Sequence, residues 1–111
     1  MKMPTFAPVY VSLYPGMCEI AIAHGYSLAV HGSVVSDFDL IAAPWTPEAV
    51  EAAALVAAIA EYVSLICGAN HHLSPVLEPE VKPHGRLAWC IPMGSGAAVD
   101  ISVMPRQFDR D

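Results

Sequence analysis

The order of the apolar patterns along the chain restricts its fold more than any other feature of the sequence. Apolar residues that recur every three or four positions predict helices, and apolar residues that alternate with others predict strands. Helical spacing covers residues 8–24 (Val9, Leu13, Met17, Ile20, Ala21) and 46–67 (Val56, Ile59, Val63, Ile66), and alternation covers residues 26–31, 37–43, 86–91 and 97–103. The order α-β-β-α-β-β predicts an α+β fold, a small mixed or antiparallel sheet with two helices on one face.

Particular residues mark where the predicted helices begin and end. Pro15-Gly16 predicts a kink in the first helix or a late start, and Gly25 predicts its end. Thr46-Pro47-Glu48 offers a capping hydroxyl, a proline suited to the first helical position and an acid for the first turn. The second helix is therefore expected to begin there and to stop at Gly68.

The second half of the chain contains a long connection and a short one. Residues 69–85 hold three prolines and predict an extended connection, whereas Met93–Gly96 predicts a hairpin between the last two strands. The segment from Met104 onward is polar and predicts a tail. At 111 residues, the chain is expected to form one domain over residues 1–111, with an ordered core of about 8–104.

The charge balance excludes some partners and suggests others. The chain carries 11 acidic and five basic residues, for a formal charge of −6, so it cannot supply the wide basic surface that extended nucleic-acid binding needs. Apolar residues make up 55% of it, which predicts surface covered by a partner or by a second copy in a homodimer. Residues 49–68 are apolar but include Glu51 and Glu61, which predicts a helix outside any membrane.

The cysteines and tryptophans are expected to serve packing. Cys18, Cys67 and Cys90 have no close pairwise spacing, which predicts reduced thiols buried as small hydrophobic groups and points to the cytosol. Trp45 and Trp89 are expected to fill the core.

Three aspartates interrupt apolar strands, where aspartate is disfavoured. Asp37 and Asp39 lie two residues apart, so in a strand both side chains point to one face, about 6.6–6.8 Å apart at Cα. Asp100 would join them if its strand neighbours residues 37–43. Carboxylates suit Mg²⁺ or Mn²⁺; the three could hold two ions, or Asp100 could act as a general base. The alternative is that all three are surface acids.

Two further side chains are candidates for binding phosphate. His31 precedes a Gly-Ser pair at the end of a predicted strand, and it could contact phosphate or serve as a hydrogen-bonded structural histidine. Arg86 stands at the start of another strand, where it could receive an anionic substrate or simply extend into solvent.

The motifs Gly32-Ser33, Asp37-x-Asp39-Leu40 and Val99-Asp100-Ile101 resemble those of the nucleotidyltransferase superfamily in its minimal form. This resemblance implies that Gly32 and Ser33 hold nucleotide phosphates. It also implies that Asp37, Asp39 and Asp100 form a catalytic Mg²⁺ or Mn²⁺ site that transfers a nucleotidyl group to a hydroxyl. Only three residues separate Ser33 from Asp37 here, a shorter segment than the family usually has. Catalysis and nucleotide binding without turnover both stay open.

The sequence also resembles small proteins of tailed phages and prophages. The shared segments are His31–Leu40 followed by Pro44-Trp45, then Lys82–Trp89, then Asp100–Arg106. This resemblance implies a phage-encoded protein in the cytoplasm of a bacterial host. It leaves a second function open, namely a non-catalytic accessory protein that binds and inhibits a host defence protein, as anti-CRISPR proteins do.

Overall fold

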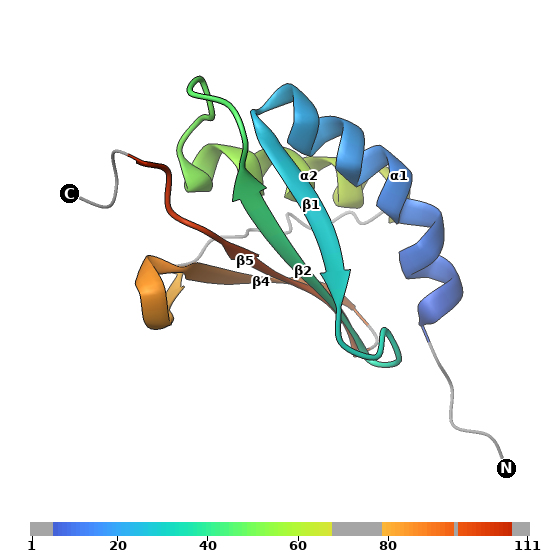
Figure 1. Ribbon diagram of the computed structural model, residues 1–111. Helices are drawn as coiled ribbons and strands as arrows, with labels where there is room; N and C mark the ends of the chain where they lie inside the picture. The colour runs from blue at the N-terminus through green and yellow to red at the C-terminus, as the bar shows by residue number, and fades with distance from the viewer. Residues whose placement is uncertain (1–5, 68–78, 95, 108–111) are drawn as a thin grey trace, which may run out of the picture.

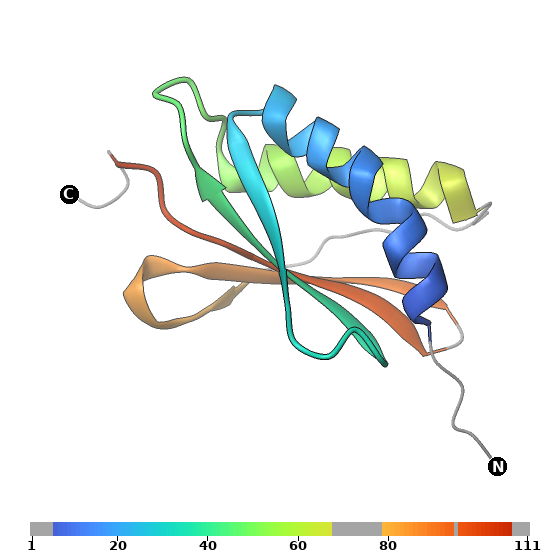
Figure 2. The ribbon, with the colours of Figure 1, turned by 45° about the vertical axis from the view of Figure 1, so that its right-hand side comes forward.

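The computed structural model describes residues 6–67, 79–94 and 96–107, and in these parts of the chain two helices lie on one face of a five-stranded sheet (Figure 1). The helices are α1 (Ala7–Ala23) and α2 (Ala52–Cys67), and a short 3-10 turn, η1, spans Pro83–Gly85. The strands are β1 (Tyr26–His31), β2 (Asp37–Pro44), β3 (Glu80–Val81), β4 (Leu87–Gly94) and β5 (Ala97–Val103). The predicted α+β fold is confirmed, and Figure 2 shows both helices on the same side of the sheet.

The sheet is mixed, with the strand order β1-β2-β5-β4-β3. β1 and β2 are antiparallel, β2 and β5 are parallel, and β4 is antiparallel to both β5 and β3. The two central strands, β2 and β5, are therefore far apart in sequence and joined through α2 and the β4 hairpin. The two-residue strand β3 was not predicted, because it lies within the proline-containing connection 69–85. Residues 69–78 of this connection fall outside the described parts.

Helix α1 runs unbroken from Ala7 to Ala23 with Pro15 inside it, so the predicted late start is wrong, and the kink stays a prediction. Its buried face, formed by Tyr10, Leu13, Met17 and Ala21, packs on the sheet and stabilises the helix despite the proline. Val9 is exposed, and the buried position expected for it belongs to Tyr10. On the α2 side, Gly16 approaches Tyr62 so closely that a side chain at Gly16 would clash with it.

Helix α2 begins at Ala52, so the predicted start at Thr46-Pro47-Glu48 is wrong. The Ala49 N–H donates to the Thr46 carbonyl at 3.2 Å, which makes this segment a turn, and the Val50 N–H donates to His24 O at 3.0 Å. The Tyr26 hydroxyl also donates to Val50 O, at 2.6 Å. Contacts with the end of α1 and the start of β1 therefore keep these residues non-helical, and the helix begins only at Ala52. Its predicted end at Cys67 is confirmed.

The core lies between the helices and the sheet. Its fully buried side chains come from both helices and from β1, β2, β4 and β5, and Trp89 is buried among them as predicted. Trp45, in contrast, is 63% exposed, because it follows the end of β2, beyond the area that the helices cover. Ile66 in the last turn of α2 is exposed as well.

The thiol predictions are wrong for two of the three cysteines. Cys67 and Cys90 are exposed and Cys18 is partly buried, and none of the three forms a disulfide. Cys67 ends α2, and Cys90 alternates onto the sheet face that the helices leave open. Among the described residues, neither helix has the length and apolar character required to cross a bilayer.

The end of the described chain continues from β5. The Met104 N–H donates to Ala42 O at 2.9 Å, so the residue after β5 remains attached to β2. Residues 108–111 of the predicted polar tail lie outside the described parts.

Candidate acidic site on the open face of the sheet

Strand alternation places the predicted acids on the face of the sheet away from the helices. In β2, Phe38 and Leu40 are buried toward the helices, so Asp37 and Asp39 project to the other side. In β5, Ile101 is buried and its neighbour Asp100 faces outward. The three acids are thus on one face, as the sequence predicted.

The parallel pairing of β2 and β5 brings two of these acids side by side. Asp39 and Asp100 are register partners, on strands that run about 4.8 Å apart. Asp37 is paired instead with Ala98, two residues nearer the start of both strands. Like charges directly opposite one another destabilise a sheet, so Asp39 and Asp100 are placed where a cation would relieve their repulsion.

β1 adds His31 and Gly32 to this row. His31 is the register partner of Asp39 across the β1–β2 pair. Gly32, with φ of +80°, follows it, and a Cβ built on Gly32 would lie 2.7 Å from the Asp39 carboxylate oxygen Oδ2. Because Gly32 has no side chain, the Asp39 carboxylate can occupy this space. Gly32 thus has a packing role in addition to the predicted phosphate-binding role.

The segment between β1 and β2 is held to α1 and β5 by Tyr10, a residue that sequence reasoning missed. The Tyr10 hydroxyl donates to Ser36 O at 2.6 Å and accepts from the Ala98 N–H at 3.1 Å. Ser33 Oγ accepts from the Val35 N–H at 3.4 Å, a bond that leaves the hydroxyl proton available to a ligand. The three-residue spacing of Tyr10 and Leu13 was the signal that could have identified Tyr10 as inward-facing.

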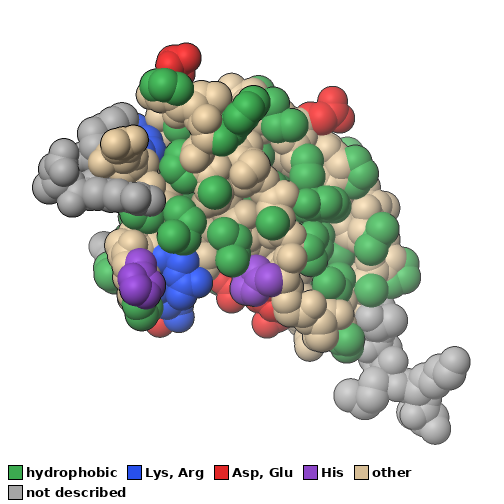
Figure 3. Space-filling view, in the orientation of Figure 1, with side chains coloured by type: hydrophobic (Ala, Val, Ile, Leu, Met, Phe, Trp, Pro, Cys, Tyr) green, Lys and Arg blue, Asp and Glu red, His purple; other side chains and the backbone are tan. Residues whose placement is uncertain are grey.

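A small cleft of about 210 Å³ lies over the Asp39–Asp100 pair. Arg86, predicted from its place at the start of β4, and His31 both line it, whereas Asp37, Gly32 and Ser33 do not. The residues around the cleft are His31, Asp39, Glu80, Lys82, Arg86, Ala88, Asp100 and Ser102. Figure 3 shows Lys and Arg side chains lying between two His side chains, with acidic side chains beside them.

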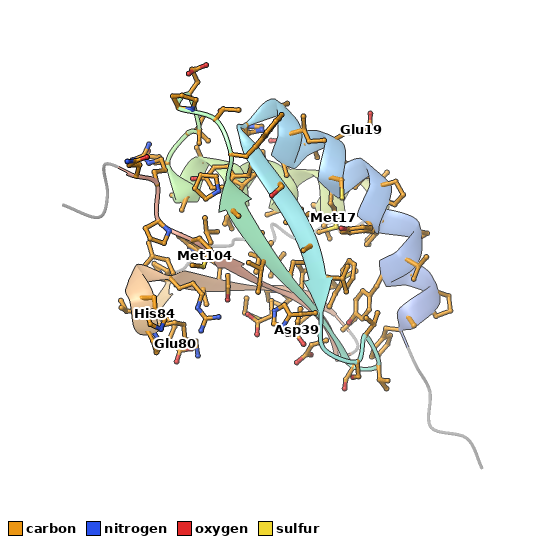
Figure 4. All side chains as sticks on the ribbon, viewed as in Figure 1. Met17, Glu19, Asp39, Glu80, His84 and Met104 are labelled. Atoms are coloured by element: carbon orange, nitrogen blue, oxygen red, sulfur yellow. The ribbon has the colours of Figure 1, made fainter. Side chains whose placement is uncertain are left out.

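Glu80 and Lys82 are the cleft residues that were not predicted as site residues. Glu80 is the first residue of β3, and Lys82 directly follows the strand. The two form an ion pair in which Lys82 Nζ lies 3.2 Å from Glu80 Oε2. Asp39 and Glu80 lie in the lower part of Figure 4, away from Met17 and Glu19 of α1. The cleft thus joins two opposed groups of charge, carboxylates in the centre of the sheet and cations at its β3 edge.

The environment of Asp100 disfavours its ionised form. Burial, followed by the charges of Asp39 and Asp37, raises the pKa of the Asp100 carboxyl, and Lys82 partly opposes this rise. Burial and the charge of Asp100 likewise raise the pKa of Cys90, its register partner on β4. Negative charge at Asp100 therefore costs the folded chain free energy.

This cost predicts that Asp100→Asn stabilises the protein at neutral pH. Because the folded pKa lies above the ordinary value of 3.8, the favourable contribution is complete below pH 3.8 and is lost as the pH rises through the folded pKa. Solvent screens the partly exposed carboxyl, so we expect the Tm at pH 7 to rise by only about 2–4 °C. Thermal unfolding followed by circular dichroism measures it.

The same scan at low pH provides the control. Well below pH 3.8 the carboxyl is protonated in both states, and Asp100→Asn should leave the Tm unchanged. Asp37→Asn removes an equal charge from the exposed start of β2 and should change the Tm less. A lower Tm for Asp100→Asn at pH 7 would contradict the repulsion inferred here.

The donor set suits a hard cation, since it consists of carboxylate oxygens. Across the described ranges 6–67, 79–94 and 96–107, no group of three or more His, Cys, Asp or Glu side chains is arranged as a metal cluster. Mg²⁺ commonly uses one or two carboxylates and keeps several waters, so the Asp39–Asp100 pair meets its minimum requirement. Comparison with protein-family models, with curated proteins and with solved structures finds no match for this chain.

Proposed function

We propose that the chain binds a nucleotide through a divalent cation on the open face of the sheet and transfers its nucleotidyl group to a hydroxyl acceptor. The observation that carries this proposal is the pairing of Asp39 with Asp100 on the two central parallel strands. Two carboxylates at the middle of a sheet cost stability unless a ligand balances them. The motif resemblance and the chain order of the acids support the same reaction class.

Asp39 and Asp100 would hold Mg²⁺ or Mn²⁺ as its two protein ligands. Asp37 lies two residues earlier on β2 and would add negative charge near the cation. When bound, the cation supplies charge stabilisation to the phosphate oxygens. Gly32 keeps the Asp39 carboxylate in place by leaving room for it. The acids would thus act as one group although they come from distant parts of the chain.

The cations of the cleft are placed to receive the phosphates. Arg86 and Lys82 line the cleft on the β3 side, and His31 lines it on the β1 side. Arginine can bind phosphate through two parallel hydrogen bonds, whereas lysine acts as a point charge. Lys82 would have to leave its ion pair with Glu80 to contribute fully.

The proposed reaction is an in-line displacement at the α-phosphorus. The acceptor hydroxyl oxygen forms the new bond, the bond to the bridging oxygen breaks, and pyrophosphate leaves with that electron pair. While Asp100 holds the cation, the hydroxyl proton passes to water. In the alternative arrangement Asp100 does not bind the cation and accepts this proton as a general base, a role favoured by the raised pKa that burial and the neighbouring acids give its carboxyl.

Calorimetry with Mn²⁺, in the presence and absence of ATP or GTP, tests the site directly. We expect wild-type protein to bind nucleotide only with the metal. Asp37→Asn/Asp39→Asn should lose at least about tenfold in affinity, because it removes the ligand Asp39 and a neighbouring negative charge. Glu19→Gln/Glu61→Gln is the matched control, since it removes the same charge from exposed positions on α1 and α2. Absence of metal and nucleotide binding in the wild type, or equal loss in the control, would refute the proposal.

A second candidate function is favoured by the exposed apolar side chains of the helices. Val11, Ile22, Leu65 and Ile66 are each more than half exposed. Such side chains are typical of protein interfaces. They favour an accessory protein that binds and inhibits a host defence protein, and the resemblance to phage proteins suggests that such a protein would be phage-encoded. Metal dependence separates the two functions: inhibition through the helices should persist in Asp39→Asn.

A further inference from the structure

A second cavity lies on the opposite side of the sheet from the acidic site. It has a volume of about 740 Å³ and opens between the first turn of α2 and the end of the sheet formed by β3 and β4. Trp89 and Val103 line it, and both are buried side chains that alternate toward the helix layer. The cavity therefore shares no lining residue with the acidic cleft.

The lining is mostly apolar. Besides Trp89 and Val103, it includes Tyr26, Leu87 and Val81, of which Val81 is 75% exposed. A β-branched apolar side chain this exposed on the wall of a cavity offers contact area to an apolar group. The remaining apolar and glycine lining comes from Ala52, Ala53, Pro79, Gly85, Met104 and Pro105.

The turn at η1 shapes one wall. His84 and Gly85 both have positive φ, +68° and +77°, and a Cβ on Gly85 would lie 3.4 Å from Pro105 Cγ. This close approach brings the chain after β5 against the turn before β4. In Figure 4, His84 and Met104 lie at the same end of the sheet.

Basic and acidic side chains both line this cavity. Arg106 and His84 are the basic residues, and Glu51 is the acid among the lining residues. Arg106 is one of only five Lys and Arg residues in a chain with 11 acids. Its Nη1 donates to Ala49 O at 3.4 Å, just before the start of α2. The first turn of α2, whose residues Ala52 and Ala53 line the cavity, adds the positive end of a 16-residue helix.

We propose that this cavity binds a small amphipathic anion, with an aromatic or aliphatic body against Trp89 and Val81 and an acidic group at Arg106 and His84. Its volume lies within the range of about 300–1,000 Å³ that is usual for small-molecule sites, and such sites combine an apolar lining with a few polar groups. The proposal does not depend on the acidic site, because the two sites lie on opposite faces of the sheet.

Two fluorescent probes of similar shape test the proposal. 8-Anilinonaphthalene-1-sulfonate carries the apolar body and an anion, and N-phenyl-1-naphthylamine carries the body alone. We expect saturable binding of both at one probe per chain, with the sulfonate bound more tightly. Decanoate, an aliphatic carboxylate, should displace the sulfonate by competing for the same volume.

Matched variants separate this cavity from other apolar surface. Ala53→Trp places a bulky side chain at the cavity wall and should weaken both probes at least about tenfold, whereas Ala57→Trp makes the same change one turn further along α2 and should not. Equal binding by the Ala53→Trp and Ala57→Trp variants, or unsaturable binding, would refute the site.

A charge-removing variant tests the anionic end. Arg106→Gln should weaken sulfonate and decanoate binding by about fivefold while leaving the uncharged probe unchanged. Circular dichroism confirms that each variant is folded, since probe binding to unfolded chains would otherwise mimic a site. If Arg106→Gln affects both probes equally or neither, the assignment of an anionic ligand is wrong.

Discussion

Replacing Gly25 with alanine is expected to destabilise the fold by about 3 kcal/mol. Gly25 has φ of +91°, and a Cβ there would lie 2.5 Å from Ala49 Cα, a backbone atom that cannot rotate away. Its carbonyl also accepts the Trp45 N–H at 2.9 Å, so the turn between α1 and β1 is joined to the segment before α2. Urea unfolding followed by circular dichroism measures the loss.

Gly96→Ala is the control for this prediction. Gly96 has a similar φ of +87°, but the nearest atom to its Cβ, Phe6 Cζ, is 3.9 Å away, which is an ordinary contact. Alanine there should cost only the backbone strain, about 1 kcal/mol. If the two variants lose equal stability, the close approach of Gly25 to Ala49 does not restrict the fold as inferred.

The regular strands could be predicted because their residues alternate. The bounds Tyr26–His31 and Ala97–Val103 agree with the sequence pattern. The strand predicted over residues 37–43 is β2, which ends one residue later, at Pro44. In these segments, local propensity and burial on one face favour the same structure.

The start of α2 could not be predicted because distant contacts outweigh a local signal there. Thr46-Pro47-Glu48 has the composition of a helix start, yet hydrogen bonds to His24 and from Tyr26 hold the following residues away from helical geometry. The exposure of Trp45 has the same origin, since the chain leaves the sheet before the helix begins. Such pairings join residues that no sequence window contains.

For the candidate site, the sequence predicted which residues face outward but not which of them meet. Spacing alone grouped Asp37 with Asp39, whereas the parallel register makes Asp39 and Asp100 the adjacent pair. Glu80 and Lys82 were missed because they reach the cleft from β3, a two-residue strand with too few residues to show a pattern.

Gly32→Ala is expected to separate the requirements of the site from those of the fold. The atom that a Cβ on Gly32 would approach is Asp39 Oδ2, at the end of a side chain that can rotate. The stability cost should therefore stay near about 1 kcal/mol, as for Gly96→Ala, because only the positive φ is penalised. The displaced carboxylate should nevertheless weaken Mn²⁺ binding by at least about tenfold, since ligand orientation controls metal affinity.

A double-mutant cycle with Asp39→Ala decides whether Gly32 acts through the carboxylate. In that background the ligand is already lost, so adding Gly32→Ala should change Mn²⁺ binding no further, which gives a strongly non-additive cycle. Additive losses would mean that Gly32 affects Mn²⁺ binding independently of the Asp39 carboxylate. Unchanged Mn²⁺ binding in Gly32→Ala alone would mean that the space beside Asp39 is a packing detail, and the acidic pair would then owe its position to the strands alone.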